Sequence, residues 1–415
     1  MKGILNNSQK KNKMKTKHQM LKCLTLLFVL VIGTIRVMAQ GPYPNEGAQT
    51  VCITGNAEPY GVIYNPGSTY SWKVDGVTTS ADWDLTATNT NLATILWKTA
   101  GIYHVQVFET TIDNCAKPLP VEVVVTVNPT PDVVATPSAQ AICNGGTTGI
   151  ALTSNLGTTS YVWTASLTSG TASGFADGSG SSIAQTLTNT TNAIATVTYT
   201  ITPLADGCPG SPITVVITVY PQVTVTATPS AQAICNGGTT GIALTGNTGA
   251  AGFIWTAALT SGTAGGFADG SGASIEQTLT NTTNALATVT YTITPSDNSC
   301  PGTVSTVVIT VYPQVTVTAT PIAEKFCTGG TTDIALTSNT GAASFTWTAT
   351  LTSGTVTGFA DGSGALISQT LVNATNVSAT VTYTITPSDN SCPGTVSTVV
   401  VTIDPMPTTS PIYHN

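Results

Sequence analysis

The chain is poor in charge, and beyond its first forty residues it has very little positive charge. Only 7% of its 415 residues are charged, and no arginine follows Arg36. All 19 acidic residues lie after residue 40. The basic residues in that part of the chain are Lys73, Lys98, Lys117 and Lys325. Such an acidic surface cannot neutralise phosphates, so the composition argues against nucleic acid or anionic lipid as partners.

Catalytic groups are scarce as well. After residue 40 the histidines are His104 and His414, and residues 130–404 have none, so no Ser–His–acid set can be assembled there. Gly145 and Gly146 lack the spacing and the lysine of a phosphate-binding loop. The acids are scattered rather than paired as in a glycosidase. We therefore expect no enzyme activity.

The first 39 residues have the composition of a secretory signal peptide. A Lys-rich start leads into the apolar stretch Leu21–Ile32, and Val37-Met38-Ala39 then ends in a small residue, which resembles a cleavage site near Ala39. The apolar stretch is shorter than the ~20 residues that span a bilayer, and no later segment is apolar enough to do so. We expect an exported chain with no membrane span after cleavage.

Eight cysteines remain after Cys23 is removed with the leader: Cys52, Cys115, Cys143, Cys208, Cys235, Cys300, Cys327 and Cys392. The last six recur with a period of 92 residues, and the first two belong to a diverged unit. A tryptophan follows the first cysteine of each pair by 20 residues, at Trp72, Trp163, Trp255 and Trp347. Two cysteines per unit without histidine cannot complete a zinc site, so the pattern predicts disulfides.

Because repeated units fold alike, the pattern predicts one disulfide inside each unit. The predicted pairs are Cys52–Cys115, Cys143–Cys208, Cys235–Cys300 and Cys327–Cys392. The predicted segments are the signal peptide (1–39), module 1 (41–129, diverged), repeat 2 (130–221), repeat 3 (222–313), repeat 4 (314–404) and a Pro-rich tail (405–415).

Each repeat has the alternating pattern of strands. In Ala195–Thr202, Val197, Tyr199 and Ile201 face one side and threonines the other. Turn signals separate about seven such runs in repeat 2, predicted near 132–136, 141–143, 149–153, 160–165, 182–188, 194–202 and 213–219. No segment longer than a turn has helical periodicity. The prediction is all-β: four tandem antiparallel β-sandwiches, with the repeated tryptophans in the cores beside the disulfides.

Repeat 2 contains four distinctive motifs: Cys143-Asn-Gly-Gly-Thr-Thr, Tyr161-Val-Trp-Thr, Ala195–Thr202 followed by proline, and Cys208-Pro-Gly. With their counterparts in the next two repeats, they resemble the PKD-like, immunoglobulin-fold modules on surface proteins of gliding bacteria that use type IX secretion. Module 1 is similar to PKD domains through Tyr70-Ser-Trp-Lys and Gly101–Val107. The resemblance implies spacers, ligand-presenting rods or adhesin segments.

Two features could bind ligands. Asp177, Asp269 and Asp361, in a recurring Phe-Ala-Asp-Gly-Ser-Gly loop, could ligate calcium, although a turn in which each aspartate bonds its own backbone explains the same residues. Trp83, flanked by Asp82 and Asp84 in an expected loop of module 1, could stack on a sugar, or could be a local packing anchor.

Taken together, these features predict a non-enzymatic, exported cell-surface rod. We expect it to act in adhesion or gliding motility, or as a scaffold for a secreted partner, with other surface or secreted proteins as partners. The alternative is a glycan- or peptide-binding protein whose site lies in module 1 and whose repeats 2–4 form the stalk. Asn189 and Asn281 match the N-glycosylation sequon, as chance predicts in a Thr-rich chain.

Overall fold

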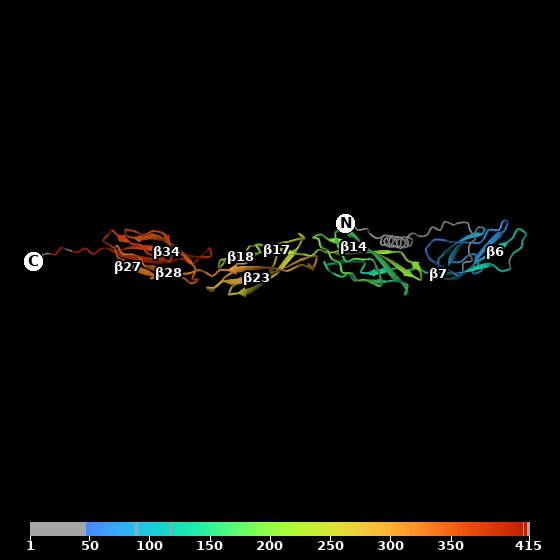
Figure 1. The fold of residues 1–415 in the computed structure, drawn as a ribbon, viewed down its shortest axis with the longest axis horizontal. Helices are drawn as coiled ribbons and strands as arrows, with labels where there is room; N and C mark the ends of the chain where they lie inside the picture. The colour runs from blue at the N-terminus through green and yellow to red at the C-terminus, as the bar shows by residue number, and fades with distance from the viewer. Residues whose placement is uncertain (1–46, 88–89, 117, 410, 413–415) are drawn as a thin grey trace, which may run out of the picture. The chain divides into compact units, whose positions relative to one another are not determined.

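Every regular element in the described part of the chain is a β-strand (Figure 1). The computed structural model describes residues 47–415 except 88–89, 117, 410 and 413–415. The predicted signal peptide lies outside the described residues. Among those that are described, no helix is long and apolar enough to cross a membrane. The chain divides into two units, with the boundary between Thr130 and Pro131, and each is described by itself.

The first unit contains module 1, a sandwich of two sheets. Its strands are β1 (Gln49–Cys52), β2 (Glu58–Gly61), β3 (Thr69–Val74), β4 (Trp83–Ala87), β5 (Leu92–Trp97), β6 (Gly101–Thr110) and β7 (Val121–Asn128). One sheet has the order β1-β7-β6-β3 and the other β2-β5-β4. The pairing of β1 with β7 is parallel, and the other pairings are antiparallel.

Repeat 2 opens the second unit, and it too has two sheets. Its strands are β8 (Val134–Thr136), β9 (Ala139–Ile142), β10 (Ile150–Thr153), β11 (Ser160–Ser169), β12 (Gly178–Ser179), β13 (Ser182–Ile183), β14 (Ala195–Ala205), β15 (Cys208–Pro209) and β16 (Ile213–Val219). The small sheet is β13-β10-β8. The large sheet is β12-β11-β14-β16-β9, with β15 forming a hairpin on β14.

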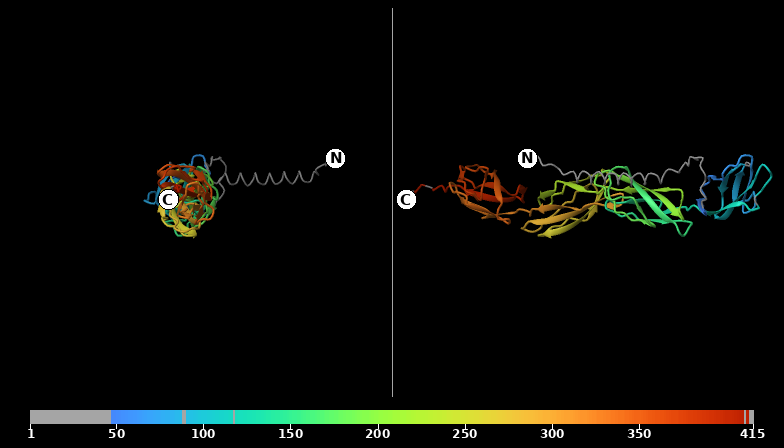
Figure 2. Two further views of the ribbon diagram at one scale, coloured as in Figure 1. Left: turned by 90° about the vertical axis from the view of Figure 1, so that its left-hand side faces the viewer. Right: turned by 45° about the vertical axis from the view of Figure 1, so that its right-hand side comes forward.

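Repeats 3 and 4 have the same two sheets, and repeat 4 adds a small two-stranded sheet. Repeat 3 contains β17 (Val225–Thr228), β18 (Ala231–Ile234), β19 (Ile242–Gly246), β20 (Gly252–Ser261), β21 (Gly270–Ser271), β22 (Ser274–Ile275), β23 (Ala287–Asp297), β24 (Cys300–Pro301) and β25 (Ser305–Val311). Repeat 4 contains β26 (Val317–Thr320), β27 (Ala323–Cys327), β28 (Ile334–Ser338), β29 (Ser344–Ser353), β30 (Val356–Thr357), β31 (Gly362–Ser363), β32 (Leu366–Ile367), β33 (Val372–Asn373), β34 (Ala379–Asp389), β35 (Cys392–Pro393) and β36 (Ser397–Asp404). Two further views of the ribbon are given in Figure 2.

The all-β sandwich prediction is confirmed, with one difference in how the strands pair. In each repeat a short early strand runs parallel to the last strand; in repeat 2, β9 pairs with β16 so that Ile142 lies opposite Val219. Periodicity identifies strands but not their partners, so it could not predict this pairing. The predicted strand 182–188 is regular only over Ser182–Ile183, and the two-residue strands β12 and β15 were not predicted.

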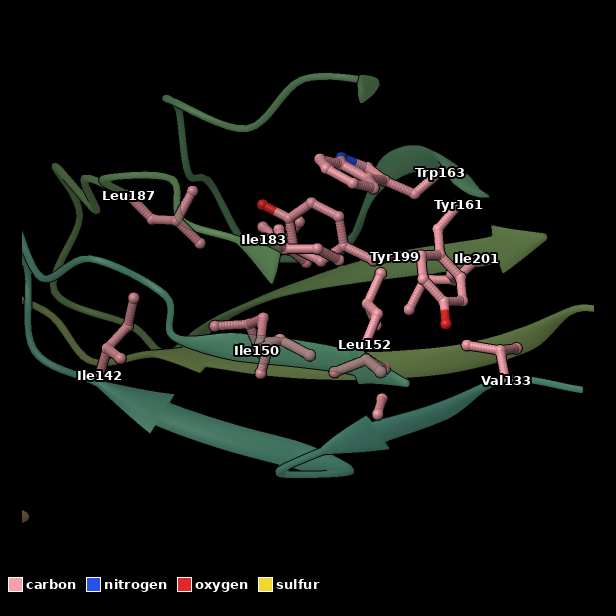
Figure 3. Close-up of a cluster of buried hydrophobic side chains, with 14 of the residues drawn as sticks. Val133, Ile142, Ile150, Leu152, Tyr161, Trp163, Ile183, Leu187, Tyr199 and Ile201 are labelled. Atoms are coloured by element: carbon pink, nitrogen blue, oxygen red, sulfur yellow. The ribbon is translucent and has the colours of Figure 1, made fainter. Parts of the chain in front are cut away.

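Alternation of residue type builds the core of each repeat. Val197, Tyr199 and Ile201 on β14 are fully buried, while the threonines between them lie on the outer, more polar face. Figure 3 shows that strands of both sheets contribute to this core: Ile150 and Leu152 come from the small sheet. Burial of such side chains contributes ~1.5–3 kcal/mol each.

The repeated tryptophans are buried in these cores. Their exposed fractions are 5% for Trp72, 7% for Trp163, 6% for Trp255 and 7% for Trp347. The indole Nε1 of Trp163 donates to the Ala176 carbonyl oxygen (3.3 Å). A Cβ on Gly178 would lie 2.7 Å from the indole ring, so glycine is required beside it. Each indole of repeats 2–4 therefore packs against a glycine loop rather than against a disulfide.

Ionisation of the core tyrosines should unfold the repeats in alkali. Burial raises the pKa of Tyr199, Tyr291 and Tyr383 to about 12. A folded-state pKa above the unfolded value near ~10 means that the stabilisation is complete below pH ~10 and is lost as the pH rises towards ~12. We expect the triple variant Tyr199→Phe, Tyr291→Phe, Tyr383→Phe to unfold at higher pH than the wild type, as measured by circular dichroism.

Tyr64→Phe provides the control, because Tyr64 is exposed. It should leave the alkaline transition unchanged. A triple variant that unfolds at the same pH as the wild type would contradict the role given to the core tyrosines.

Candidate functional site

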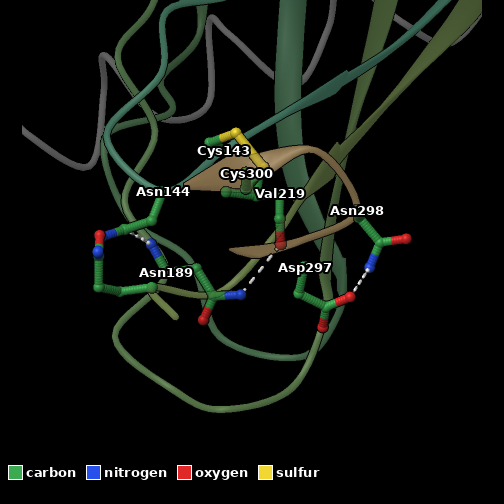
Figure 4. Close-up of a disulfide and its surroundings, with 8 residues drawn as sticks. Cys143, Asn144, Asn189, Val219, Asp297, Asn298 and Cys300 are labelled. Atoms are coloured by element: carbon green, nitrogen blue, oxygen red, sulfur yellow. Dashed lines mark hydrogen bonds between the residues drawn. A yellow bond between two sulfur atoms is a disulfide. The ribbon is translucent and has the colours of Figure 1, made fainter. Parts of the chain in front are cut away.

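Four cysteines of the second unit form two disulfides that join neighbouring repeats. Cys143 of repeat 2 is bonded to Cys300 of repeat 3, 157 residues later, with a Cα–Cα distance of 5.5 Å (Figure 4). Cys235 of repeat 3 is bonded in the same way to Cys392 of repeat 4, also 157 residues later. Each of these two junctions therefore has two covalent connections, the linker and the disulfide.

The predicted pairing within each unit is wrong. Cys52 and Cys208 are also disulfide-bonded, whereas Cys115 and Cys327 are free and exposed. The prediction of eight bonded cysteines therefore fails at Cys115 and Cys327.

The physical reason is that the two cysteines of a repeat lie at opposite ends of its sandwich. In repeat 3, Cys235 follows β18, whose Ile234 lies opposite Val311 where the chain leaves the repeat. Cys300 lies in the hairpin of β23 and β24, near the end where the chain enters. The seven residues of β25 separate the two ends by about 20 Å at a strand rise of ~3.3 Å. A disulfide requires Cα atoms within ~7 Å, so the bond within one repeat cannot form.

The Cys-Pro-Gly motif positions the second cysteine at the entry end. Thr303 donates its backbone N–H to the carbonyl oxygen of Val223, the first core residue after the linker (2.9 Å). A Cβ on Gly302 would overlap that carbonyl group, and Gly394 has the same relation to Val315. Glycine is therefore needed for the hairpin to lie against the start of its repeat and to direct Cys300 towards the preceding one.

Amide side chains connect the repeats around the linkers. Asn247 of repeat 3 donates to Asn192 of repeat 2 (2.8 Å) and to the carbonyl of the linker residue Gln222 (2.9 Å). At the next junction Asn339 donates in the same way to Asn284 and to the Gln314 carbonyl (2.8 and 2.9 Å). The same polar contacts thus recur at two junctions 92 residues apart.

A polar hollow of about 530 Å³ lies beside the first of these linkers. It is lined by Asn144, Thr188, Asn189, Thr190, Thr191, Asn192, Gln222, Thr224 and Asn247. The lining has amide and hydroxyl groups but no charged side chain. The hollow therefore offers hydrogen bonds and no charged group for catalysis.

A buried asparagine organises the exit end of each repeat. The Asn189 side chain is 1% exposed, and its Nδ2 donates to the carbonyls of Ala193 (2.7 Å) and Val219 (3.0 Å, Figure 4). Its Oδ1 accepts from the backbone and hydroxyl of Thr191. Asn281 and Asn373 make the same contacts. The amides of the two sequons are thus used inside the fold.

Trp83 is not the exposed loop residue that the sequence predicts. It lies on β4, is 4% exposed, and its ring centroid is 5.5 Å from that of Tyr103. Trp97 stacks on the same tyrosine, with its ring centroid 4.9 Å from that of Tyr103. An indole packed among core rings has no face left for a sugar, so the packing interpretation replaces the glycan site.

The acids beside Trp83 have structural partners. Asp84 pairs with the Lys98 ammonium (2.6 Å), and both side chains are partly exposed. The Asp82 carboxylate accepts a hydrogen bond from Ser80 (3.3 Å). Both carboxylates therefore have polar partners, and the alternating pattern of β4 turns Asp84 outward where it turns Trp83 inward.

The recurring loop aspartates are also structural. Asp177 Oδ1 accepts the backbone N–H of Ala165, twelve residues earlier (2.8 Å), and Asp269 and Asp361 accept from Ala257 and Ala349. The predicted bond to the aspartate's own turn is therefore replaced by a bond to a neighbouring strand. Among the residues with described structure, no three His, Cys, Asp or Glu side chains gather to hold a metal.

Comparison with known proteins identifies the repeated unit. A model of the PKD-like domain matches residues 140–223, 232–315 and 324–407, more than half of the chain. No curated protein matches.

Solved structures that match at low identity include three multidomain proteins. Drosophila N-cadherin EC1-4 is 9% identical, with 87% of this chain and 99% of that chain covered and a TM-score of 0.26. Human CDH23 EC21-23 is 14% identical, with 63% and 97% covered and a TM-score of 0.30. An I-band fragment of titin is 11% identical, with 64% and 95% covered and a TM-score of 0.34.

Peptide mapping should find disulfides between repeats rather than inside them. Digestion of the oxidised chain under non-reducing conditions is expected to yield peptides linking Cys143 to Cys300 and Cys235 to Cys392, because the two cysteines of each pair lie side by side across a junction. Mass spectrometry provides the measurement. A peptide linking Cys235 to Cys300 would show that the sandwich ends are placed wrongly.

Loss of the buried asparagine should loosen one repeat selectively. Asn189→Ala removes the side-chain donor to the buried Val219 carbonyl and the acceptor of the Thr191 N–H and hydroxyl, which together cost about 3 kcal/mol at ~1–3 kcal/mol per group. We expect hydrogen exchange in repeat 2 to accelerate by about 100-fold at that cost, while repeat 3 in the same molecule provides an internal reference. Thr190→Ala, at the neighbouring exposed position, should leave exchange unchanged. Equal effects of the two variants would contradict the assigned role.

Proposed function

This chain belongs to the PKD-like domain family, and we propose that it is an exported, non-catalytic surface protein that acts as a stiffened molecular spacer. The observation that carries the proposal is the pair of disulfides between repeats, Cys143–Cys300 and Cys235–Cys392. Disulfides persist in oxidising compartments outside the cytosol, which supports export through the predicted signal peptide.

The disulfides act on the geometry between repeats. A single linker leaves two domains free to bend about it, since interdomain motion is the usual behaviour of short interfaces. A second covalent connection on another side of the junction opposes that bending. Successive sandwiches coupled in this way would form an extended rod, with each unit contributing ~30–40 Å at a strand rise of ~3.3 Å.

The surface of the repeats suits a role outside the cell. Threonine hydroxyls on neighbouring strands bond to one another, as Thr168 does to Thr196 (2.9 Å) and Thr198 (3.1 Å). Equivalent threonines in repeats 3 and 4 do the same. The face is therefore polar without charge and favours extended backbone.

A non-catalytic role is supported by the surroundings of the ionisable groups. Among the residues that the structure describes, His104 is the one histidine. Its Nδ1 lies 2.8 Å from the Glu122 carboxylate on an exposed strand face. The strongly raised pKa values belong to buried core tyrosines. A core phenol has no substrate beside it on which to act.

We propose adhesion, gliding motility or scaffolding of a secreted partner as the roles of this spacer, with other surface or secreted proteins as its partners and the type IX route as a means of export. The resemblance of the repeats to surface modules of gliding bacteria supports this proposal. A glycan site in module 1 is not carried further, because Trp83 is buried.

Solution scattering of the oxidised chain without residues 1–39 tests the spacer. We expect a maximum dimension above ~100 Å from four units in line. Replacing all four cysteines of the two bridges by serine should broaden the distance distribution, because each linker then bends freely. A compact particle would contradict the rod, and an unchanged distribution in the variant would contradict the stiffening role of the disulfides.

Cells provide the second test of the same proposal. Surface proteolysis of intact cells should degrade the chain, and deletion of its gene should reduce attachment to a surface or movement across it. A protected chain would contradict surface exposure. Unchanged attachment and movement would leave scaffolding of a secreted partner as the role, to be tested by loss of that partner from the surface fraction.

A further inference from the structure

Cys115 and Cys327 occupy the same structural positions as cysteines that are bonded inside the chain. Cys327 ends β27, which runs parallel to β36, just as Cys143 and Cys235 follow β9 and β18. It is the exit-end cysteine of repeat 4. At the equivalent positions of repeats 2 and 3 the cysteine is bonded across a junction, whereas Cys327 is free and exposed.

Cys115 is the complementary, entry-end cysteine of module 1. Thr110 forms a bridge with Ala116, and Thr111 donates its N–H to the Cys115 carbonyl (3.0 Å), so Cys115 begins the returning limb of the hairpin after β6. Cys300 and Cys392 begin the same limb in repeats 3 and 4, at β24 and β35. One exit-end cysteine, Cys327, and one entry-end cysteine, Cys115, are therefore free. At two junctions inside the chain, an exit-end cysteine is bonded to an entry-end cysteine.

We propose that Cys327 of one molecule forms a disulfide with Cys115 of a second copy, which links chains head to tail. The contact repeats the arrangement already formed at two junctions, and the chain itself carries both halves of it. A heterologous contact of this kind does not close on itself and therefore produces linear multimers. The proposal extends the spacer function, on which it rests for an oxidising location.

Side chains beside Cys327 preserve part of the junction. The Thr328 hydroxyl accepts the Asn373 N–H (2.8 Å), as the Asn144 side chain accepts that of Asn189 (2.7 Å) in repeat 2. Asn376 is exposed, at the position where Asn192 accepts a hydrogen bond from the next repeat. The acceptor for a following module is thus present at the exit end of repeat 4.

Other side chains differ, and the difference predicts how the link is broken. Asn144 donates to the side chain of Gln222 at the internal junction (3.3 Å), whereas threonine and Met406 occupy the corresponding positions of repeat 4. Lys325 and Asp404 form an ion pair there (3.1 Å). With this amide pair absent, the link between molecules depends more on the disulfide, so reduction should separate the chains.

The chemistry is thiol–disulfide exchange with a small-molecule disulfide such as oxidised glutathione as the oxidant. The Cys327 thiolate attacks one sulfur of glutathione disulfide, which forms a mixed disulfide and releases one glutathione thiolate. The Cys115 thiolate of the second copy then attacks Cys327 Sγ and releases the other. Two protein thiols are oxidised, and one glutathione disulfide is reduced to two glutathione molecules.

The experiment incubates the full chain lacking residues 1–39 with oxidised glutathione and separates the products on non-reducing gels. We expect a ladder of multimers that collapses to monomer with a reductant. Cys115→Ser and Cys327→Ser should each abolish the ladder, while a mixture of the two variants should form dimers and nothing larger. Isotope-labelled and unlabelled chains identify a Cys327–Cys115 peptide from two different molecules by mass spectrometry.

Several outcomes would overturn the proposal: absence of multimers, dimers formed by either single variant alone, or a Cys115–Cys327 peptide within one chain. Recovery of the Cys143–Cys300 and Cys235–Cys392 peptides verifies that each variant is folded. Scattering of the double variant Cys115→Ser, Cys327→Ser tests the spacer on monomers. An extended double variant from a chain that forms no multimers would refute the linkage and leave the spacer function standing.

Discussion

The parallel pairing of a short early strand with the last strand of the same repeat is the constraint on which the cross-linking depends. Because Ile142 on β9 lies opposite Val219 on β16, Cys143 is placed where the chain leaves repeat 2. The hairpin carrying the other cysteine of a repeat is held against the first residues of that repeat, at the opposite end. A bond can then form only across a junction, between the exit of one repeat and the entry of the next.

Disulfides at the junctions leave the stability of each sandwich to its own packing. The cores are clusters of aliphatic and aromatic side chains, closed by tyrosine–glutamine contacts such as Tyr199–Gln185 (2.7 Å). Each disulfide between repeats joins cysteines 157 residues apart. In the simplest model, closing a loop of that length lowers the entropy of the unfolded chain and stabilises the fold by ~5 kcal/mol. Repeat arrays gain stability from nearest-neighbour interfaces, and here a covalent bond is part of that interface.

Module 1 shows how local sequence misleads about exposure. Acidic residues on both sides of Trp83 suggest a solvent-exposed loop. The alternation of buried and exposed side chains along β4 instead turns the indole inward and Asp84 outward, where it pairs with Lys98. The partner that buries the indole, Tyr103, comes from β6, and its position follows from the packing of two sheets. Residue type on either side of a tryptophan therefore carries less information than the strand pairing around it.

The sequence alone determined the all-β fold, the 92-residue unit and most strands of repeat 2, because alternation and turn residues act locally. It could not determine the disulfide partners. A repeat symmetry of 92 residues is satisfied equally by a bond within each unit and by a bond to the next, as the observed separation of 157 residues illustrates. Only the tertiary structure distinguishes them, because the distance between two cysteines depends on which end of the sandwich each strand pairing assigns to them.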